Sequence, residues 1–313
     1  MAGDVRHMWA IILAGGEGRR VRSLTTNAVG EAAPKQFCSF GTGVSLIRRA
    51  IDRAAAIVPP QHIVTVVAPQ HRRWWEHELS DLPVENTVVQ PQDRGTAAGI
   101  LLPLNRVLRC DPEAQVVVVP SDHYVENEPR LRAAILDAIL VADGSDGRVV
   151  LLGIMPRACD TEYGWIVPVT ANDAGNVPAR RVESFVEKPD GERARSLMCR
   201  GAVLNSFILA ASGKALLGLF EHAAPHLLER FSGWQADAPM GPLEVEMLYE
   251  DLPTCDFSRN ILERSCHRLW VVRVPDCGWV DLGTPARLRD FRSSRVSVDT
   301  VREKESEAPM PVG

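Results

Sequence analysis

Short apolar runs alternate with stretches of helical spacing through the first half of the chain, and this rhythm constrains the fold more than any other feature. Trp9–Ala14 and Gln115–Pro120 are apolar almost throughout, which is typical of strands buried on both faces. The alternation predicts an α/β fold with a mostly parallel sheet and helices on both faces. The expected strands are 9–14, 63–68, 87–90, 115–120 and 148–153, and the expected helices are 45–57, 70–79, 96–109 and 129–141.

After Ile154 the pattern is less regular. A charged, proline-bearing stretch closes the chain, so we expect one domain over residues 1–293 and a flexible tail over 294–313. Strands are expected at 163–169, 181–187, 202–210 and 269–274, with a turn-rich segment at 170–176 and helices through the 210s to the 260s.

Composition excludes several classes of function. The net charge of −5 and the pI near 5.9 argue against a nucleic-acid or membrane-surface binder, because either needs a broad cationic face. No stretch is long and apolar enough to span a bilayer, and no signal-peptide pattern opens the chain. The seven cysteines form no Cys-x-x-Cys pair, so we expect reduced thiols and a cytoplasmic protein.

A glycine-rich loop directly follows the first expected strand. Gly15, Gly16 and Gly18 let the backbone approach a phosphate closely, and three arginines (19, 20 and 22) add positive charge. Pro34-Lys35 follows, and its ammonium is a mobile point charge against phosphate oxygens. The loop matches neither the dinucleotide-binding nor the P-loop pattern, and alone it is equally compatible with an ordinary strand-to-helix turn.

Two carboxylates follow expected strands. Asp122 lies in Pro-Ser-Asp-His at the carboxyl end of the most apolar strand, the sheet edge where ligands of α/β proteins bind. Asp281 lies between two glycines in the segment 277–284. Two carboxylates from distant parts of a sequence suit Mg²⁺ shared with phosphate oxygens, whereas His123 is the less expected ligand. Spacing alone cannot bring Asp122 and Asp281 together, so their joint site is a hypothesis.

Together these segments resemble the sugar-nucleotide pyrophosphorylases, and within them the mannose-1-phosphate guanylyltransferases. The family opens on a glycine-rich motif followed by Pro-Lys, as this chain does at 13–25 and 34–35, and Pro-Lys-Gln-Phe is similar to the mannose branch. The matches run in family order from residue 11 to about 288. The other matching segments are 90–97, 120–123, 162–166, 185–189, 204–207, 256–263 and 278–283.

The resemblance implies a Rossmann-like, glycosyltransferase-A-like nucleotidyltransferase fold, with a nucleotide-binding half over about 1–154 and a sugar-binding half over about 155–293. It implies condensation of GTP with mannose 1-phosphate, with Arg20 and Lys35 as catalytic residues and Mg²⁺ on Asp122 and Asp281. A homo-oligomer is compatible with it. The implied nucleotide-binding residues are Leu13, Ala14, Gly15, Gly16, Gly18, Arg19, Gln90, Gly95, Thr96 and Ser121, and the sugar-phosphate residues are Tyr163, Gly164, Glu187, Lys188 and Asn205.

The chain departs from the family pattern at four positions. Arg19 and Ser23 replace a threonine and a proline in the phosphate loop, while Leu204 and Phe207 replace a tryptophan and a glycine expected to border the sugar pocket. Two alternatives therefore stay open: a UTP- or dTTP-dependent glucose-1-phosphate pyrophosphorylase, and a non-catalytic regulator that binds a sugar nucleotide. A chain of 313 residues is not expected to carry the extra C-terminal domain of the bifunctional relatives.

Overall fold

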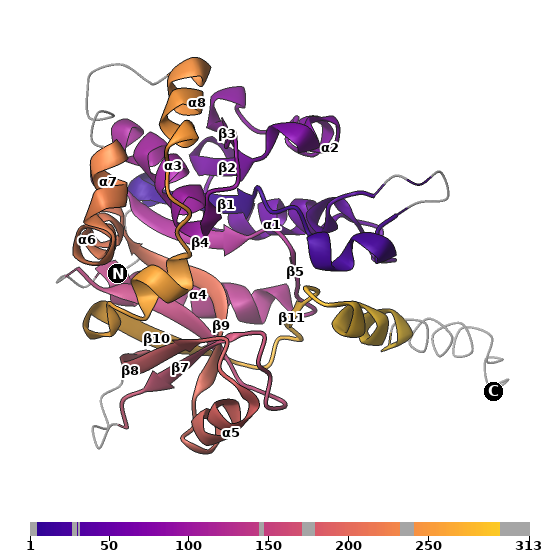
Figure 1. Cartoon of the computed structure of the whole chain (residues 1–313), viewed down its shortest axis with the longest axis vertical. Helices are drawn as coiled ribbons and strands as arrows, with labels where there is room; N and C mark the ends of the chain where they lie inside the picture. The colour runs from indigo at the N-terminus through magenta and orange to yellow at the C-terminus, as the bar shows by residue number, and fades with distance from the viewer. Residues whose placement is uncertain are drawn as a thin grey trace, which may run out of the picture.

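A nine-stranded sheet organises the part of the chain that is described. The computed structural model describes residues 5–26, 30, 32–143, 147–170, 179–231 and 241–294. The strand order is β3-β2-β1-β4-β9-β6-β10-β8-β7 (Figure 1). The strands are β1 Met8–Ala14, β2 Ile63–Val67, β3 Thr87–Val89, β4 Gln115–Pro120, β6 Val149–Ile154, β7 Gly164–Pro168, β8 Ala179–Glu187, β9 Val203–Ser212 and β10 Leu269–Val274.

Most strands of this sheet run in one direction. β1 pairs parallel with β2 and β4, β2 with β3, and β6 with β10. β9 runs against β4, β6 and β7, and β8 runs against β7 and β10. The predicted mostly parallel sheet is therefore confirmed, although β9, which comes from the second half of the chain, lies between two strands of the first half.

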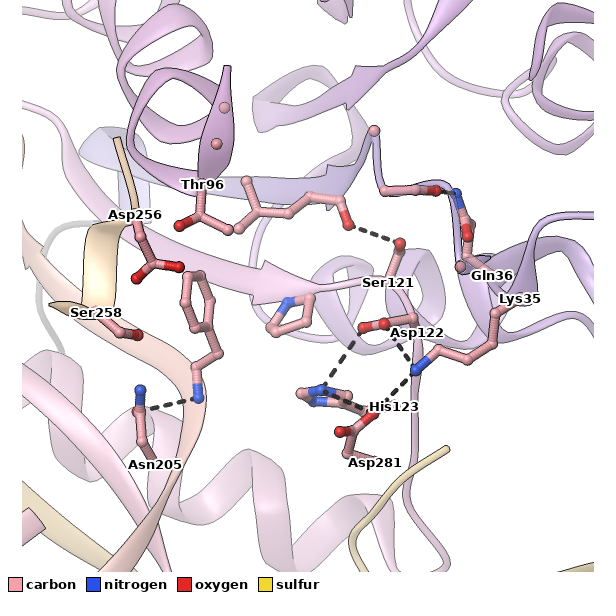
Figure 2. Close-up of a pocket in the computed structure, with 18 of the residues that line it drawn as sticks. Lys35, Gln36, Thr96, Ser121, Asp122, His123, Asn205, Asp256, Ser258 and Asp281 are labelled. Carbon is pink, nitrogen blue, oxygen red and sulfur yellow. Dashed lines mark hydrogen bonds and ion pairs between the residues drawn. The ribbon is translucent and has the colours of Figure 1, made fainter. Parts of the chain in front are cut away.

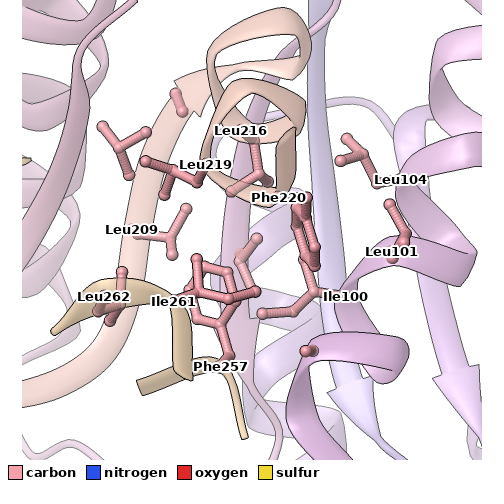
Figure 3. Close-up of a cluster of buried hydrophobic side chains, with 14 of the residues drawn as sticks. Ile100, Leu101, Leu104, Leu209, Leu216, Leu219, Phe220, Phe257, Ile261 and Leu262 are labelled. Atoms are coloured by element: carbon pink, nitrogen blue, oxygen red, sulfur yellow. The ribbon is translucent and has the colours of Figure 1, made fainter. Parts of the chain in front are cut away.

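Helices cover both faces of the sheet, as predicted. Alternate side chains of β4 and β9 enter different cores, so that Val118 and Leu209 face α3 and α6 while Val119 and Ala210 face α1 and α4. Figure 3 shows the first of these cores, where Phe220 and Phe257 pack among leucines. The helices are α1 Leu46–Ala55, α2 Arg72–Glu78, α3 Gly95–Cys110, α4 Glu128–Asp143, α5 Gly191–Cys199, α6 Gly213–Ala223, α7 Pro225–Phe231 and α8 Pro242–Glu250.

Short elements complete the frame around the carboxyl edge of the sheet. A two-stranded ribbon pairs β5 His123–Tyr124 with β11 Val280–Asp281, and the helical segment 285–294 follows it. A π-helix, η8 Phe257–Leu262, reaches the same edge. The short 3₁₀ turns are η1 Val5–His7, η2 Arg19–Leu24, η3 Lys35–Phe37, η4 Pro60–His62, η5 Pro69–His71, η6 Val84–Asn86 and η9 Cys266–Arg268.

The element bounds agree with the sequence pattern to within a few residues. The main difference is α2, which begins at Arg72 because a 3₁₀ turn takes up the start of the expected helix 70–79. Most of the turn-rich segment 170–176 and nearly all of the expected tail 294–313 lie outside the described residues. All seven cysteines are free, as predicted. Within the described ranges, no helix is long and apolar enough to cross a membrane.

Candidate active site

A cavity of about 460 Å³ opens where β1 and β4 end, at the carboxyl edge of the sheet. The loop after β1, the start of α3 and the end of β4 form one side. β7, β8, β9 and the first turn of η8 form the other (Figure 2). All of the predicted site residues line this cavity except Ala14 and Arg19.

The glycine loop after β1 is held by the side chain of Gln36. Its Nε2 donates hydrogen bonds to the carbonyl oxygens of Ala14 and Gly16, at 2.9 and 2.8 Å. Gly18 has a φ of 62°, and a Cβ there would lie 3.1 Å from the backbone nitrogen of Lys35. Glycine is required at this position because of both its backbone conformation and this close approach. The sequence indicated the glycines but not the role of Gln36.

The predicted juxtaposition of Asp122 and Asp281 is confirmed. Asp122 lies between β4 and β5, and the ribbon of β5 and β11 pairs Asp281 with His123 in register. Candidate ligand atoms of these three residues all lie within 4.8 Å of one another. A ribbon of two-residue strands therefore joins positions that the sequence could not relate to each other.

The ammonium of Lys35 lies between the two carboxylates (Figure 2). Its Nζ is 2.8 Å from Oδ2 of Asp122 and 2.9 Å from Oδ1 of Asp281. Burial lowers the pKa of Lys35, but the two carboxylates outweigh burial and leave that pKa raised. Burial likewise raises the pKa of Asp122, and the nearby Lys35 reverses this and holds it at about 2. Lys35 and Asp122 are therefore both charged at neutral pH.

His123 faces this cluster as a neutral imidazole. Burial lowers its pKa, and its Nδ1 accepts a hydrogen bond of 3.3 Å from the indole of Trp279. A neutral imidazole that accepts at Nδ1 carries its proton on Nε2. The Nε2 atom is 3.6 Å from Oδ1 of Asp122, so this proton points toward the carboxylates. In this tautomer Nε2 donates a hydrogen bond and does not accept one; that His123 is a less expected metal ligand than the two aspartates stays a prediction.

The donor set of the cluster fits a magnesium ion. Mg²⁺ takes hard oxygen ligands and is usually bound by one or two carboxylates plus substrate phosphates. Asp122 and Asp281 supply such oxygens, and the ammonium of Lys35 already shows that the space between them attracts a cation. Lys35 is the side chain that must share these carboxylates with an incoming ion.

The two neighbouring arginines of the loop point in different directions. Arg20 lines the cavity, and its Nη1 lies 2.5 Å from Oε2 of Glu162, which lines it as well. Arg19 instead pairs with Glu17, its side chain is 76% exposed, and it lies outside the cavity. Successive side chains of a 3₁₀ helix are about 120° apart, because the helix has three residues per turn, so the two arginines leave the helix on different sides. The predicted contact of Arg19 with the nucleotide is therefore not supported, nor is that of Ala14, which is buried within β1.

The nucleotide side of the cavity is built at the start of α3. The amide of Gly95, one of the predicted nucleotide-binding residues, donates to Oδ1 of Asp93 at 2.9 Å. Gly95 has a φ of 83°, and a Cβ there would overlap the backbone of Cys255. Thr96 Oγ1 accepts from the amide of Phe257 at 2.8 Å. These contacts fix the start of η8 against α3.

Two residues of this region, Asp256 and Ser258, also line the cavity. Figure 2 shows Asp256 near Thr96 and Ser258 near Asn205, between the two sides of the site. The sequence pattern assigned neither a role. The segment that contains them was recognised by resemblance, but its placement depends on the contacts between η8 and α3.

The sugar side of the cavity comes from β7, β8 and β9. Glu187 ends β8, and burial raises the pKa of its carboxyl while Lys188 partly offsets this effect. Nζ of Lys188 is 3.2 Å from Oε1 of Glu187. Gly164 lies so close to Glu187 that a Cβ there would be 2.6 Å from Oε2. Tyr163 and Asn205 complete a wall with both acceptors and donors of hydrogen bonds.

Leu204 and Phe207, the two residues of the sugar side that depart from the family pattern, lie in different surroundings. Phe207 lines the cavity, as predicted. Leu204 was expected to border the sugar pocket as well, and this expectation is wrong. Its side chain is buried in a separate cluster with Trp165 and Leu197, because it lies on the side of β9 that faces α5.

Arg287 is a site residue that no sequence pattern indicated. Its guanidinium donates to Oδ2 of Asp281 at 3.2 Å and to Oδ2 of Asp160 at 2.5 Å, and it lies 3.9 Å from the ring centre of Tyr163. The arginine therefore connects the segment 285–294 to the carboxylate cluster and to the sugar side.

Comparison with known proteins places this site in a family. A family model described as nucleotidyl transferase matches residues 9–295. The chain belongs to the nucleotidyl transferase family. The match includes the loop after β1, both carboxylates and the sugar-side wall.

Curated relatives carry more specific names. The chain is 28% identical over 288 residues to the xanthan biosynthesis protein XanB of Xanthomonas campestris, a match that covers 90% of this chain and 58% of XanB. It is 28% identical over 281 residues to a mannose-1-phosphate guanylyltransferase of Escherichia coli, covering 88% of this chain and 58% of that protein. The chain thus spans a little over half the length of these relatives.

Solved structures show the same fold. The match to a structure titled mannose-1-phosphate geranyltransferase from Thermus thermophilus has a TM-score of 0.75 at 27% identity and covers 88% of this chain and 76% of that one. A UDP-glucose pyrophosphorylase structure matches with a TM-score of 0.58 at 13% identity over 93% of this chain and 98% of the other. The second likeness concerns the fold alone.

Replacing Gln36 with leucine tests its role in holding the glycine loop. The Gln36→Leu variant leaves the carbonyls of Ala14 and Gly16 without their donor, so we expect the free energy of unfolding to fall by about 1–3 kcal/mol. Urea denaturation measures this change. Gln61→Leu, at an exposed position, is the matched control and should change stability by less than about 0.5 kcal/mol. Equal stability of the two variants would contradict the proposed role of Gln36.

Proposed function

We propose that this chain condenses a sugar 1-phosphate with a nucleoside triphosphate and releases pyrophosphate, with mannose 1-phosphate and GTP as the substrates. The observation that carries the proposal is the two-sided cavity. Arg20, Lys35 and two carboxylates lie at its phosphate end, and the hydrogen-bonding wall of Glu187 and Asn205 faces them. Such a cavity suits two phosphorylated ligands that must meet.

The reaction is an attack by a phosphate oxygen of the sugar phosphate on the α-phosphorus of the triphosphate. A new phosphorus–oxygen bond forms, the bond to the β-phosphate oxygen breaks, and pyrophosphate leaves with that electron pair. The nucleophile is already ionised at neutral pH, so no side chain has to remove a proton. The chain's contribution is to align two anions and to neutralise their repulsion.

The charged residues divide this work. Arg20, on the loop after β1, is placed to bind the triphosphate and the leaving pyrophosphate. Lys35 neutralises charge near the reacting phosphates, and Lys188 is the candidate contact for the sugar phosphate. Mg²⁺ held by Asp122 and Asp281 would supply charge neutralisation at the phosphates. Because the two positive charges of the ion would match the negative charges of the two carboxylates, the charge of Lys35 would then be available to the phosphates.

The choice of mannose 1-phosphate and GTP as substrates is based on the curated relatives. Mannose and guanine come from relatives at 28% and 27% identity that are named mannose-1-phosphate guanylyltransferase, together with the similarity of Pro-Lys-Gln-Phe to the mannose branch. Glu187 and Asn205 are proposed to bind the sugar hydroxyls, and Gln90 to contact the base. Free cysteines throughout the chain fit a reducing compartment, so we propose a cytoplasmic enzyme.

The proposal is tested by a matrix of four nucleoside triphosphates and several sugar 1-phosphates. We expect the highest rate of pyrophosphate release for GTP with mannose 1-phosphate, because the polar wall is proposed to bind mannose and Gln90 is proposed to contact guanine. A coupled phosphate assay measures each pair. Faster turnover of UTP or dTTP with glucose 1-phosphate would show that these are the substrates and not GTP and mannose 1-phosphate. No turnover together with tight nucleotide binding would indicate a regulator.

Arg20 and Arg19 provide a matched pair of substitutions. Arg20→Ala removes a charge that faces the cavity and should lower kcat by ~10²–10³-fold, the usual effect of losing one such contact in the transition state. Arg19→Ala should leave kcat nearly unchanged, because Arg19 pairs with Glu17 outside the cavity. Steady-state kinetics measure both, with urea denaturation as the stability control. A loss of stability without a loss of kcat in Arg20→Ala would assign this arginine a structural role.

Asp281→Asn tests the magnesium site. Because a carboxylate oxygen binds Mg²⁺ more strongly than an amide does, we expect the dissociation constant for Mg²⁺ to rise at least about tenfold. Isothermal titration calorimetry measures binding directly, and the magnesium dependence of turnover gives a second readout. Asp276→Asn, at an exposed position, is the matched control. Unchanged Mg²⁺ binding in Asp281→Asn would exclude Asp281 as a ligand.

A further inference from the structure

A bulge in β9 directs one side chain into the cavity. Leu151 of β6 pairs with Leu209 of β9, and Gly153 pairs with Asn205. One residue of β6 therefore lies opposite the three residues 206–208 of β9. Bulges of this kind re-aim side chains and are frequent next to active sites.

Side chains of β9 itself stabilise the bulge. Ser206 Oγ donates to the carbonyl oxygen of Leu152 at 2.7 Å and accepts from the amide of Ile208 at 3.2 Å. Oδ1 of Asn205 accepts from the amide of Phe207 at 3.1 Å. Because its Oδ1 is engaged, Asn205 presents its amide group as the hydrogen-bond donor for a ligand.

The backbone at Phe207 is in a conformation that favours glycine. Its φ is 61°, in the left-handed region that residues with a side chain rarely adopt. Among the described residues, three non-glycine residues have a positive φ, and two of these, Lys188 and Phe207, line the cavity. Strained backbone of this kind persists where the surrounding structure enforces it, and it gathers at functional sites.

The ring of Phe207 is supported from behind and faces the cavity. It packs edge-on against Phe257 with ring centres 6.1 Å apart and adjoins the core beneath α6. It is half-buried, and it lines the cavity together with Asn205 and Ser258. A glycine in the same backbone conformation would leave this space to a ligand.

We infer that Phe207 limits the size of the sugar that the cavity accepts. Given the proposed function, its ring restricts the site to a hexose 1-phosphate without a bulky ring substituent and excludes 2-acetamido sugars. Glu187 and the amide group of Asn205 bind the hydroxyls, and the phenyl ring closes the space beside them. The strained backbone is retained because the bulge holds the ring in this position.

Two substitutions open the space that the ring fills. Phe207→Gly suits the left-handed backbone, and Phe207→Asn is a second variant with a small side chain that tolerates it. Isothermal titration calorimetry with mannose 1-phosphate and N-acetylglucosamine 1-phosphate gives the ratio of their dissociation constants. We expect this ratio to shift toward the acetamido sugar by about tenfold or more, with GTP affinity unchanged within twofold.

Phe40→Gly is the matched control. Phe40 also has a positive φ, of 50°, but lies outside the cavity in a cluster with Val21 and Leu46, so its replacement should leave the ratio unchanged. An unchanged ratio in both Phe207 variants, or a change in GTP affinity alone, would overturn the inference. Pyrophosphate release by the unsubstituted protein tests the proposed function separately. Sugar binding without turnover would overturn that function and leave the size limit standing.

Discussion

The ion pairs of Lys35 with Asp122 and Asp281 hold together parts of the chain that are far apart in sequence. The lysine comes from the loop beyond β1, one aspartate from the end of β4, and the other from β11 near the end of the described residues. Two carboxylates this close would repel each other without a cation between them. Arg287 adds a further contact to Asp281 and extends the network to the sugar side. The phosphate end of the cavity depends on this balance of charge.

A single sheet positions the two sides of the cavity relative to each other. β9 belongs to the second half of the sequence but lies between β4 and β6, so the proposed nucleotide-binding and sugar-binding halves share one pair of cores. Asn205 and Phe207, on the strand beside β4, therefore line the same cavity as the residues that follow β4. The bulge in β9 directs the ring of Phe207 into the cavity and fixes the amide of Asn205, which a regular strand would not do at the same time.

Elements buried on both faces were readable from sequence, whereas short or mixed elements were not. β4 and β10 have the predicted bounds because continuous apolar runs have few alternatives to a buried strand. β11 is two residues long, too short for any periodicity, yet its pairing with β5 assembles the site. The π-helix η8 also has no simple sequence pattern. Its start is fixed by hydrogen bonds to the beginning of α3, which no local signal encodes.

The sequence by itself determined the α/β class, the glycine loop and the identity of the charged residues, because local pattern and residue chemistry suffice for these. Only the tertiary structure decided which of them meet. It brought Asp281 close to Asp122, turned Arg20 toward the cavity and Arg19 away, buried Leu204 and exposed Phe207 to the cavity. Strand pairing, helix phase and a bulge set these directions. These features depend on contacts between segments that are far apart in the sequence, so a local sequence pattern does not reveal them.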